Sequence, residues 1–235
     1  MSDFEYSGSE LDVFVHATNW KSYWASIVGP FFGETILDVG AGVGATARNF
    51  RSRNHRRWLE LEPDAQLADR IRASIRQGSL PASIEVRNGT SRSLAQDDKF
   101  DTILYIDVLE HIADDAIELA KVSRHLSPGG RIIILAPAHN WLYTPFDRQI
   151  GHFRRYSKAT LLATKPAALS LECLRYVDSV GLLASLANRL LLKTAAPTFR
   201  QVQIWDSLMI PASRVADRIL AGSVGKSIIA VFRNQ

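Results

Sequence analysis

Three glycines spaced by two follow directly on a short apolar run, and no other feature constrains the fold of this chain as strongly. Residues 36–44 read Ile-Leu-Asp-Val-Gly-Ala-Gly-Val-Gly, so an expected strand runs into Gly40, Gly42 and Gly44. A strand-to-helix turn this tight needs residues without Cβ, both to reach positive φ and to let the backbone lie against a ligand. The pattern therefore predicts a nucleotide-binding turn. A glycine-rich surface loop is the alternative interpretation.

Asp38, just before the first glycine, indicates which kind of ligand the turn binds. A carboxylate here would repel the pyrophosphate of NAD or FAD. S-adenosylmethionine has no phosphate and carries an ammonium and a sulfonium group, which a nearby carboxylate favours. We therefore expect S-adenosylmethionine as the cofactor. A nicotinamide-dependent dehydrogenase is a weaker alternative, because Asp38 and the G-x-G-x-G spacing both disfavour it.

A second acidic residue, Glu62, ends the strand expected over residues 58–62. Its distance from Gly44 is the one at which a βαβ unit places the acid that hydrogen-bonds a ribose. Glu60 is the competing candidate, since it points to the same face of the strand. The residue at the carboxyl edge is nevertheless the one that meets ligands in an open sheet. An ordinary solvated glutamate at a strand end is the remaining alternative.

Four motifs resemble, in the same order, those of the class I S-adenosylmethionine-dependent methyltransferases. They are residues 38–44, Glu62-Pro63-Asp64, residues 99–112 and residues 126–134, so the resemblance extends over most of the chain. It implies a Rossmann-like methyltransferase fold and the following cofactor-binding residues: Asp38, Gly40, Gly42, Gly44, Glu62, Pro63, Thr90, Ser91, Ile106 and Asp107. In the segment 89–91, many relatives have an aspartate that takes the adenine amino group, whereas this chain offers hydroxyl and backbone groups.

Alternating strand and helix patterns predict the α/β class with a doubly wound, mostly parallel seven-stranded sheet. Strands are expected near 35–39, 58–62, 83–88, 100–106 and 131–136, and helices near 17–29, 44–54, 64–77 and 113–126. Two later strands, 171–177 and 227–232, are expected to pair antiparallel, as the resemblance implies. The expected organisation is a single methyltransferase domain over 1–235, with an N-terminal helical cap over 1–33 and a helical insertion over 178–222.

The charge and the cysteine content indicate which binding partners and which cellular compartment to expect. The net charge is +4 and the densest basic run is 48–57, but no nucleic-acid-binding module is recognisable, so no nucleic-acid partner is expected. The single cysteine, Cys173, and an amino terminus without an apolar leader favour a cytoplasmic protein. The apolar stretch 180–192 is too short and too polar to span a bilayer, although a peripheral membrane contact stays open. The sequence does not indicate an oligomeric state.

Two clusters of polar residues compete for the chemistry, and the first follows the fourth expected strand. This cluster runs from Asp107 to Ile112. If the ring of His111 points into the cleft, it is expected to act as a general base, because an imidazole titrates near neutral pH. Alternatively, Glu110 and His111 begin the next helix and stabilise its first turn.

The second cluster, residues 137–156, concentrates histidine, arginine and aromatic side chains after the fifth expected strand. Arg154 and Arg155 are expected to clamp a carboxylate or phosphate, with His152 or Tyr156 near the nucleophile. Alternatively, an arginine pairs with Asp147 to brace the loop, and we expect at least one of the two to do so. The segment 151–156 also resembles a motif of a bacterial methyltransferase subgroup often associated with glycosyltransferases, which implies a carbohydrate or envelope-related acceptor.

The predicted reaction is in-line transfer of the sulfonium methyl to an oxygen of a small molecule, either a hydroxyl or a carboxylate, with transfer to nitrogen as the alternative. The expected catalytic residues are His111, His152, Arg155 and Tyr156, and an anionic or sugar-like acceptor is favoured. No catalytic metal is expected, because no histidines and carboxylates have zinc-type spacing. A non-catalytic S-adenosylmethionine-binding protein is the rival from another class.

Overall fold

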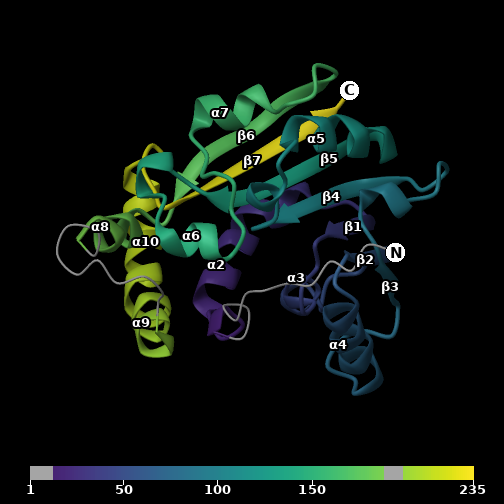
Figure 1. Ribbon diagram of the computed structural model, residues 1–235, viewed down its shortest axis with the longest axis horizontal. Coiled ribbons are helices and arrows are strands. Elements are labelled where there is room, and N and C mark those ends of the chain that lie inside the picture. Colours follow the sequence, from purple (N-terminus) through teal and green to yellow (C-terminus); the bar gives the residue numbers. More distant parts are fainter. Residues whose placement is uncertain (1–12, 188–197) are drawn as a thin grey trace.

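The protein is built on a seven-stranded sheet, seen in a computed structural model that describes residues 13–187 and 198–235 (Figure 1). The strand order is β3-β2-β1-β4-β5-β7-β6. The first five strands run parallel to their neighbours, and β7 lies antiparallel between β5 and β6. The predicted mostly parallel sheet with an antiparallel pair at the C-terminal end is confirmed.

Most element bounds agree with the expected ranges, but β5 begins at Leu126 rather than near residue 131, and α3 and α5 are shorter than expected. The strands are β1 Thr35–Val39, β2 Arg57–Glu62, β3 Ile84–Asn88, β4 Phe100–Ile106, β5 Leu126–Pro137, β6 Leu169–Val177 and β7 Ser227–Asn234. The main helices are α2 Thr18–Val28, α3 Ala45–Asn49, α4 Ala65–Arg76, α5 Asp115–Val122, α6 Pro145–Gln149, α7 Lys158–Ala163, α8 Ser179–Ala187, α9 Phe199–Ile204 and α10 Ile210–Ile219. The π-helical turn η7, Trp205–Met209, joins α9 to α10.

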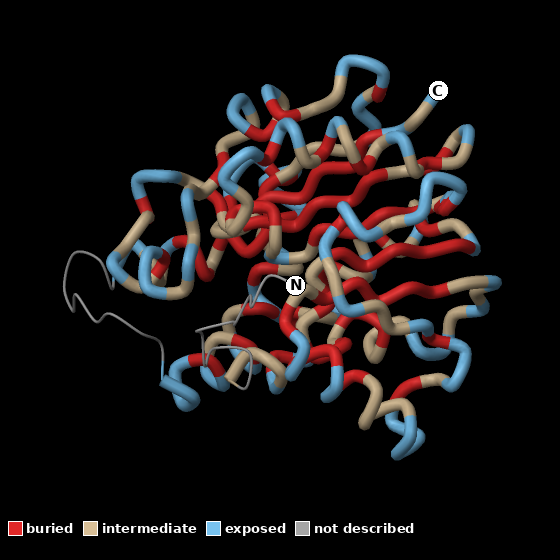
Figure 2. Tube along the Cα trace, turned by 45° about the vertical axis from the view of Figure 1, so that its right-hand side comes forward, coloured by how far each residue is buried: buried red, intermediate tan, exposed pale blue. Residues whose placement is uncertain are grey.

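Two layers of helices sandwich the sheet and explain why its central strands are apolar throughout. Helices α5 and α7 pack on one face, and α2, α3, α4 and α10 pack on the other. Along β4, Ile103 and Tyr105 contribute to the first layer and Leu104 to the second, and all three are fully buried. Figure 2 shows these buried strands enclosed by exposed loops and helix surfaces. A strand covered on both faces reads as a continuous apolar run rather than as an alternation.

Helix α3 is shorter than the expected 44–54 because Phe50, directly after its last residue, packs on the aromatic ring of Phe32. The ring of Phe50 stacks on Phe32 at 4.4 Å between centroids. Just beyond it, Arg53 donates hydrogen bonds to the carbonyls of Gly29 and Phe32. The chain therefore leaves α3 to pack under β1 instead of continuing the helix.

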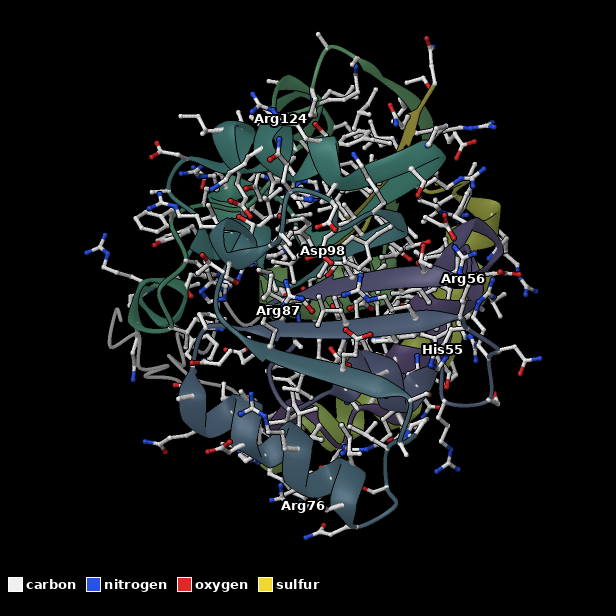
Figure 3. All side chains as sticks on the ribbon, turned by 90° about the vertical axis from the view of Figure 1, so that its right-hand side faces the viewer. His55, Arg56, Arg76, Arg87, Asp98 and Arg124 are labelled. Atoms are coloured by element: carbon white, nitrogen blue, oxygen red, sulfur yellow. The ribbon has the colours of Figure 1, made fainter. Side chains whose placement is uncertain are left out.

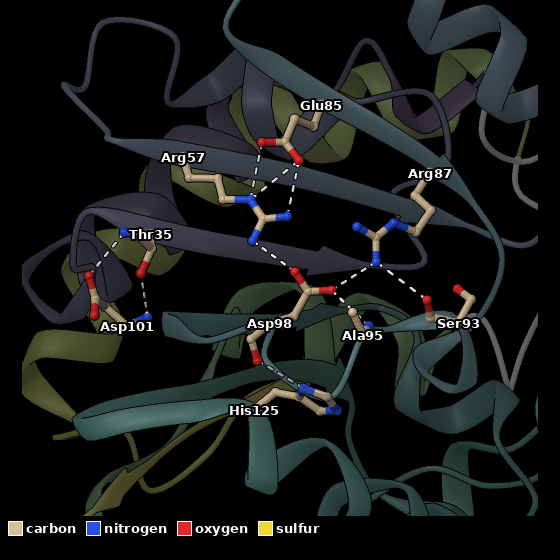
Figure 4. Close-up of polar contacts among 9 residues, drawn as sticks. All are labelled: Thr35, Arg57, Glu85, Arg87, Ser93, Ala95, Asp98, Asp101 and His125. Carbon is tan, nitrogen blue, oxygen red and sulfur yellow. Dashed lines mark hydrogen bonds and ion pairs between the residues drawn. The ribbon is translucent and has the colours of Figure 1, made fainter.

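A polar network around Asp98 ties the outer strands to the start of β4 (Figure 4). Its carboxylate accepts hydrogen bonds from Arg57 Nη1 and Arg87 Nη1, each at 2.9 Å, and from the Ala95 N–H at 2.9 Å. Burial alone would raise the pKa of Asp98, but these bonds outweigh it and lower the pKa to about 2. Figure 3 shows Arg87 beside Asp98. Arg57 and Arg87 on this face are therefore paired with an acidic residue of the protein itself.

The segment between β6 and β7 forms helices that pack against α2. Asp217 of α10 accepts hydrogen bonds from the Tyr23 hydroxyl and from the N–H groups of Asp178 and Ser179. Asp206 accepts the N–H groups of Asn19 and Trp20 at the start of α2. The expected helix over 180–192 is seen as α8 up to Ala187, and its remainder lies outside the described residues. Across residues 13–187 and 198–235, the helices are too short or too polar to cross a bilayer.

Candidate active site

A cavity of about 1520 Å³ lies over the carboxyl ends of β1, β2, β4 and β5, the edge at which open α/β sheets bind ligands. Helices α2, α6 and α8 and the turn η7 contribute its walls. It extends from the glycine turn to the loop after β5. Most of the predicted site residues line it, namely Gly40, Gly42, Glu62, Pro63, Thr90, Ser91, Ile106, Asp107, His111, His152 and Arg155. Asp38, Gly44 and Tyr156 do not.

The glycine turn takes the conformation that its spacing predicts. Gly40, Gly42 and Gly44 have φ values of 68°, 59° and 71°. A Cβ on Gly40 would lie 2.8 Å from Val108 Cγ2, and one on Gly44 would lie 2.9 Å from Leu80 Cδ1. Both positions therefore require glycine for the backbone conformation and for space.

Glu62 holds the glycine turn while remaining on the cavity surface. Its Oε2 accepts the Gly42 N–H at 2.7 Å, and its Oε1 accepts the Asp64 N–H at 2.9 Å. Burial raises the pKa of Glu62 to about 7, although these two backbone bonds oppose the shift. The carboxyl group is thus fixed in place by the backbone, with its remaining lone pairs available to a ligand.

The structure places Asp38 beneath the turn and outside the cavity lining, so its role as a cofactor-binding residue stays a prediction. Strand β1 is central, and Asp38 lies in register with Glu60 of β2. The two side chains are 1% and 0% exposed, and their proximity makes it unfavourable for both to be ionised. Burial raises the pKa of Asp38 to about 7 and that of Glu60 well above its usual range, while the Thr46 hydroxyl stabilises the Asp38 carboxylate. Glu60, the alternative ribose partner, is likewise outside the cavity lining.

Residues after β3 and β4 line the sides of the cofactor half. Thr90 and Ser91 border the cavity, and the Ser91 hydroxyl donates to Glu118 Oε2 at 2.9 Å. Asp107 has a φ of 54°, and its N–H donates to the Leu135 carbonyl at 2.8 Å. Its carboxylate opens onto the cavity, where the surrounding protein raises its pKa to about 6.

The loops after β4 and β5 bring Glu110, His111 and His152 together at the cavity wall. The Phe153 N–H donates to the Glu110 carbonyl at 2.8 Å, which fastens one loop to the other. The rings of His111 and His152 lie 4.6 Å apart between centroids. Burial, with a contribution from His152, lowers the pKa of His111 to about 4, so its imidazole is neutral near pH 7. Burial also raises the pKa of Glu110 well above its usual range.

Asp147 organises the second predicted cluster from within. Its Oδ1 accepts from His152 Nδ1 at 3.0 Å, and its two oxygens accept from Arg155 at 2.8 and 3.0 Å. Asp147 also caps α6 through Thr144. Despite its burial, the bonds from His152 and Arg155 hold the pKa of Asp147 well below its usual range. The bracing alternative therefore describes Arg155, although this side chain also lines the cavity.

Arg154 and Tyr156 both face Asp115 instead of the cavity. Arg154 Nη1 lies 2.5 Å from Asp115 Oδ2, and its Nη2 donates to the Ala113 carbonyl. The Tyr156 hydroxyl donates to Asp115 Oδ2 at 2.7 Å, and the residue is 1% exposed. Both residues join the loop after β5 to the start of α5, so the structure does not bring Tyr156 to the acceptor side.

Lysine residues at the cavity were not among the predicted site residues. Lys21 of α2 donates to the carbonyls of Phe14 and Val15, and burial lowers its pKa to about 8. Lys226 precedes β7, and its Nζ lies 4.9 Å from the centroid of the Trp205 ring. Neither lysine belongs to a local motif, so only the folded arrangement reveals them.

Comparison with known proteins agrees with this geometry. Residues 37–134 match the family of methyltransferase domains. The chain is 35% identical over 117 residues to the ubiquinone biosynthesis O-methyltransferase of Chelativorans sp. (strain BNC1), covering 45% of this chain and 41% of the relative. It is 27% identical over 157 residues to the demethylmenaquinone methyltransferase of Tropheryma whipplei (strain Twist), covering 66% and 64%. The alignments thus span less than two thirds of either relative.

The fold is shared with solved methyltransferase structures. One is Haemonchus contortus phosphoethanolamine N-methyltransferase 2 in complex with phosphomonomethylethanolamine and S-adenosylhomocysteine, with a TM-score of 0.62, 14% identity, and coverage of 98% of this chain and 60% of that one. The sheet order, the glycine turn and the family match define a class I methyltransferase fold. Residues 37–134 are therefore similar to methyltransferase domains, and this match supports S-adenosylmethionine as the cofactor.

Proposed function

We propose that the protein transfers a methyl group from S-adenosylmethionine to an oxygen of a small molecule bound between the cofactor and the loop after β5. One observation carries this proposal: the cavity is continuous from Glu62 and the glycine turn to His111 and His152. Its volume of about 1520 Å³ exceeds the roughly 300–1,000 Å³ of a pocket for one drug-sized ligand, so it has room for a second molecule.

The walls of the acceptor half favour a small molecule with an apolar or aromatic body. Apolar side chains from several elements line it, including Leu142, Phe146, Ile150, Val202 and Trp205. The curated relatives named for ubiquinone biosynthesis and demethylmenaquinone methylation support an acceptor of this kind. Lys226 on the same cavity would suit an acidic substituent. Ala184 and Val202 also line it, which supports the proposal that the helical segment 178–222 covers the site of a single methyltransferase domain.

The protein would promote the reaction mainly by aligning the acceptor oxygen with the methyl group and the sulfur, because the sulfonium is already an activated methyl donor. His152 is oriented by Asp147 through Nδ1, so its Nε2 is directed toward Glu110 at the cavity wall. An imidazole held in this way can accept a proton from an acceptor hydroxyl as the oxygen attacks the methyl group. Arg155 positions Asp147 rather than touching the reacting atoms. A carbohydrate acceptor is the second candidate, favoured by the resemblance of residues 151–156 to the glycosyltransferase-associated subgroup.

The test separates cofactor binding from turnover. Release of S-adenosylhomocysteine is measured with a panel of phenolic and sugar hydroxyl acceptors, and phenolic acceptors are expected to react. His152→Ala should leave S-adenosylmethionine affinity within about 0.5 kcal/mol of wild type, as for changes away from a binding site. Its turnover should fall by roughly 10²-fold or more, the range for a lost acid–base group. His55→Gln is the control, since His55 pairs with Ser83 and does not line the cavity. Wild-type turnover in His152→Ala would remove His152 from the proposed chemistry.

A further inference from the structure

Glu110 has a carboxyl group whose surroundings do not satisfy it. The residue is 1% exposed, and no donor among the described residues reaches either oxygen with hydrogen-bond geometry. Only its own backbone amide approaches it weakly, and His152 Nε2 lies 3.8 Å from Oε1. A buried carboxylate without partners is costly, so such a group in a cavity wall indicates a missing cation or donor.

Two imidazoles complete a set of metal-ligating atoms around this carboxylate. One ligand atom from each of Glu110, His111 and His152 lies within 4.8 Å of the other two. Atoms bound to one tetrahedral zinc ion lie about 3.3 Å apart, given bond lengths of roughly 2.0–2.2 Å. Small side-chain rotations would therefore bring the three into a shared coordination sphere.

The groups behind the histidines are those that orient metal ligands. His152 Nδ1 hydrogen-bonds to Asp147 Oδ1 at 3.0 Å, which directs Nε2 to the side of Glu110. His111 hydrogen-bonds to the backbone at Gly151. Metal-bound histidines characteristically hold a carboxylate or carbonyl on the second ring nitrogen in this way. The acidic residues Asp107 and Asp147 and the basic residue Arg155 act on Glu110 electrostatically.

We propose that Glu110, His111 and His152 bind a divalent first-row transition-metal ion at the wall of the cavity. Two nitrogens and one carboxylate oxygen suit zinc, iron or manganese better than magnesium, which prefers an all-oxygen sphere. Three protein ligands leave a coordination position toward the cavity. An acceptor hydroxyl bound there would have a lowered pKa, and the histidines would then serve as ligands rather than as proton acceptors. Spacing in the sequence did not suggest this site, because His152 reaches the other two only through the fold.

Metal binding can be measured without any acceptor, so the test is separate from that of the proposed methyl transfer. Protein without a polyhistidine tag is stripped with a chelator and titrated with Zn²⁺ against a chromophoric competitor, and Co²⁺ binding is followed by its visible absorption. Wild type should bind one Zn²⁺ per chain and should not respond to Mg²⁺ at equal concentration. Glu110→Gln and His152→Ala should each weaken Zn²⁺ binding by about 100-fold or more, since even a lost orienting group costs roughly 10–100-fold.

Controls distinguish a lost ligand from a damaged fold. Glu110→Gln keeps the side-chain shape and replaces a buried carboxyl group that has no hydrogen-bond partner, so without metal it should melt at or above the wild-type temperature. Added Zn²⁺ should raise the melting temperature of wild type and of His55→Gln but not that of Glu110→Gln. If Glu110→Gln does not fold, His152→Ala and the Co²⁺ spectrum decide. The proposal would be overturned if wild type did not bind Zn²⁺ stoichiometrically, or if wild type and His152→Ala bound Zn²⁺ with equal affinity.

Discussion

The Glu62 carboxyl group should control cofactor affinity in a manner that depends on pH. Glu62→Gln removes a charge-assisted hydrogen bond to the ribose, which is worth about 1.5–3 kcal/mol, so S-adenosylmethionine should bind roughly 10- to 150-fold more weakly. The substitution also leaves one of two backbone donors facing an amide NH₂, because Oε2 and Oε1 accept from Gly42 and Asp64 separately. Loss of that second bond should lower the free energy of unfolding by about 1–3 kcal/mol.

The pKa of Glu62, about 7, predicts the direction and the size of the change in cofactor affinity with pH. If ribose hydroxyls donate to the ionised carboxylate, as we propose, cofactor binding favours deprotonation of Glu62. The dissociation constant of wild type should therefore rise about tenfold between pH 8 and pH 6, since a group of pKa 7 is mostly ionised at the former and mostly protonated at the latter. Glu62→Gln should lack this dependence.

Isothermal titration calorimetry with S-adenosylmethionine and S-adenosylhomocysteine at several pH values measures both effects. Glu85→Gln is the matched control, because Glu85 lies on β3, pairs with Arg57 and does not line the cavity. Its affinities should equal those of wild type at every pH. Equal affinity and equal pH dependence in wild type and Glu62→Gln, with the fold intact, would refute Glu62 as the ribose partner.

Two further substitutions test the packing beneath the cavity. Because the pKa of Asp38 is raised to about 7 in the folded state, its proton stabilises the fold fully below about pH 4, and this stabilisation is lost as the pH rises to about 7. Relative to wild type, the free energy of unfolding of Asp38→Asn, measured with urea, should therefore gain up to about 4 kcal/mol over that range. Parallel pH curves for the two proteins would exclude the buried pair as the cause. Gly44→Ala should lower the free energy of unfolding by roughly 2 kcal/mol or more in thermal melts. It combines positive φ with the Leu80 contact, whereas Gly78→Ala has similar φ and open space and should cost only about 1–2 kcal/mol.

Local patterns in the sequence were sufficient for the sheet and for the conformation of the glycine turn. The apolar runs of β1, β4 and β5 and the glycines between them depend on neighbours along the chain, and so does the position of Glu62 at the end of a strand. Helix α3 departed from its expected length because Phe50 packs on Phe32, a contact with a segment that precedes β1. A helix end fixed by such a contact has no signal in its own composition.

The acceptor half was harder to predict because its partners are distant in sequence. Charge composition marked Arg154, Arg155 and Tyr156 as a ligand-binding group, yet the acids they meet are Asp115 and Asp147. An arginine beside a cleft has the same local sequence whether it binds substrate or braces a loop. Which of the two it does depends on whether a carboxylate from another segment reaches it first.

The preference for S-adenosylmethionine over a dinucleotide is better explained by the backbone than by Asp38. In phosphate-binding turns, the glycine N–H groups point at the phosphate oxygens. Here the N–H groups of Gly40 and Ala41 donate to the Leu61 carbonyl, that of Gly44 donates to Ala41, and that of Gly42 donates to Glu62. These amides are therefore already satisfied, and a pyrophosphate placed against the turn would meet the carboxylate of Glu62. Glu62, which we propose as the ribose partner, already accepts the Gly42 N–H that a phosphate would need, whereas a cofactor without phosphate incurs no such loss.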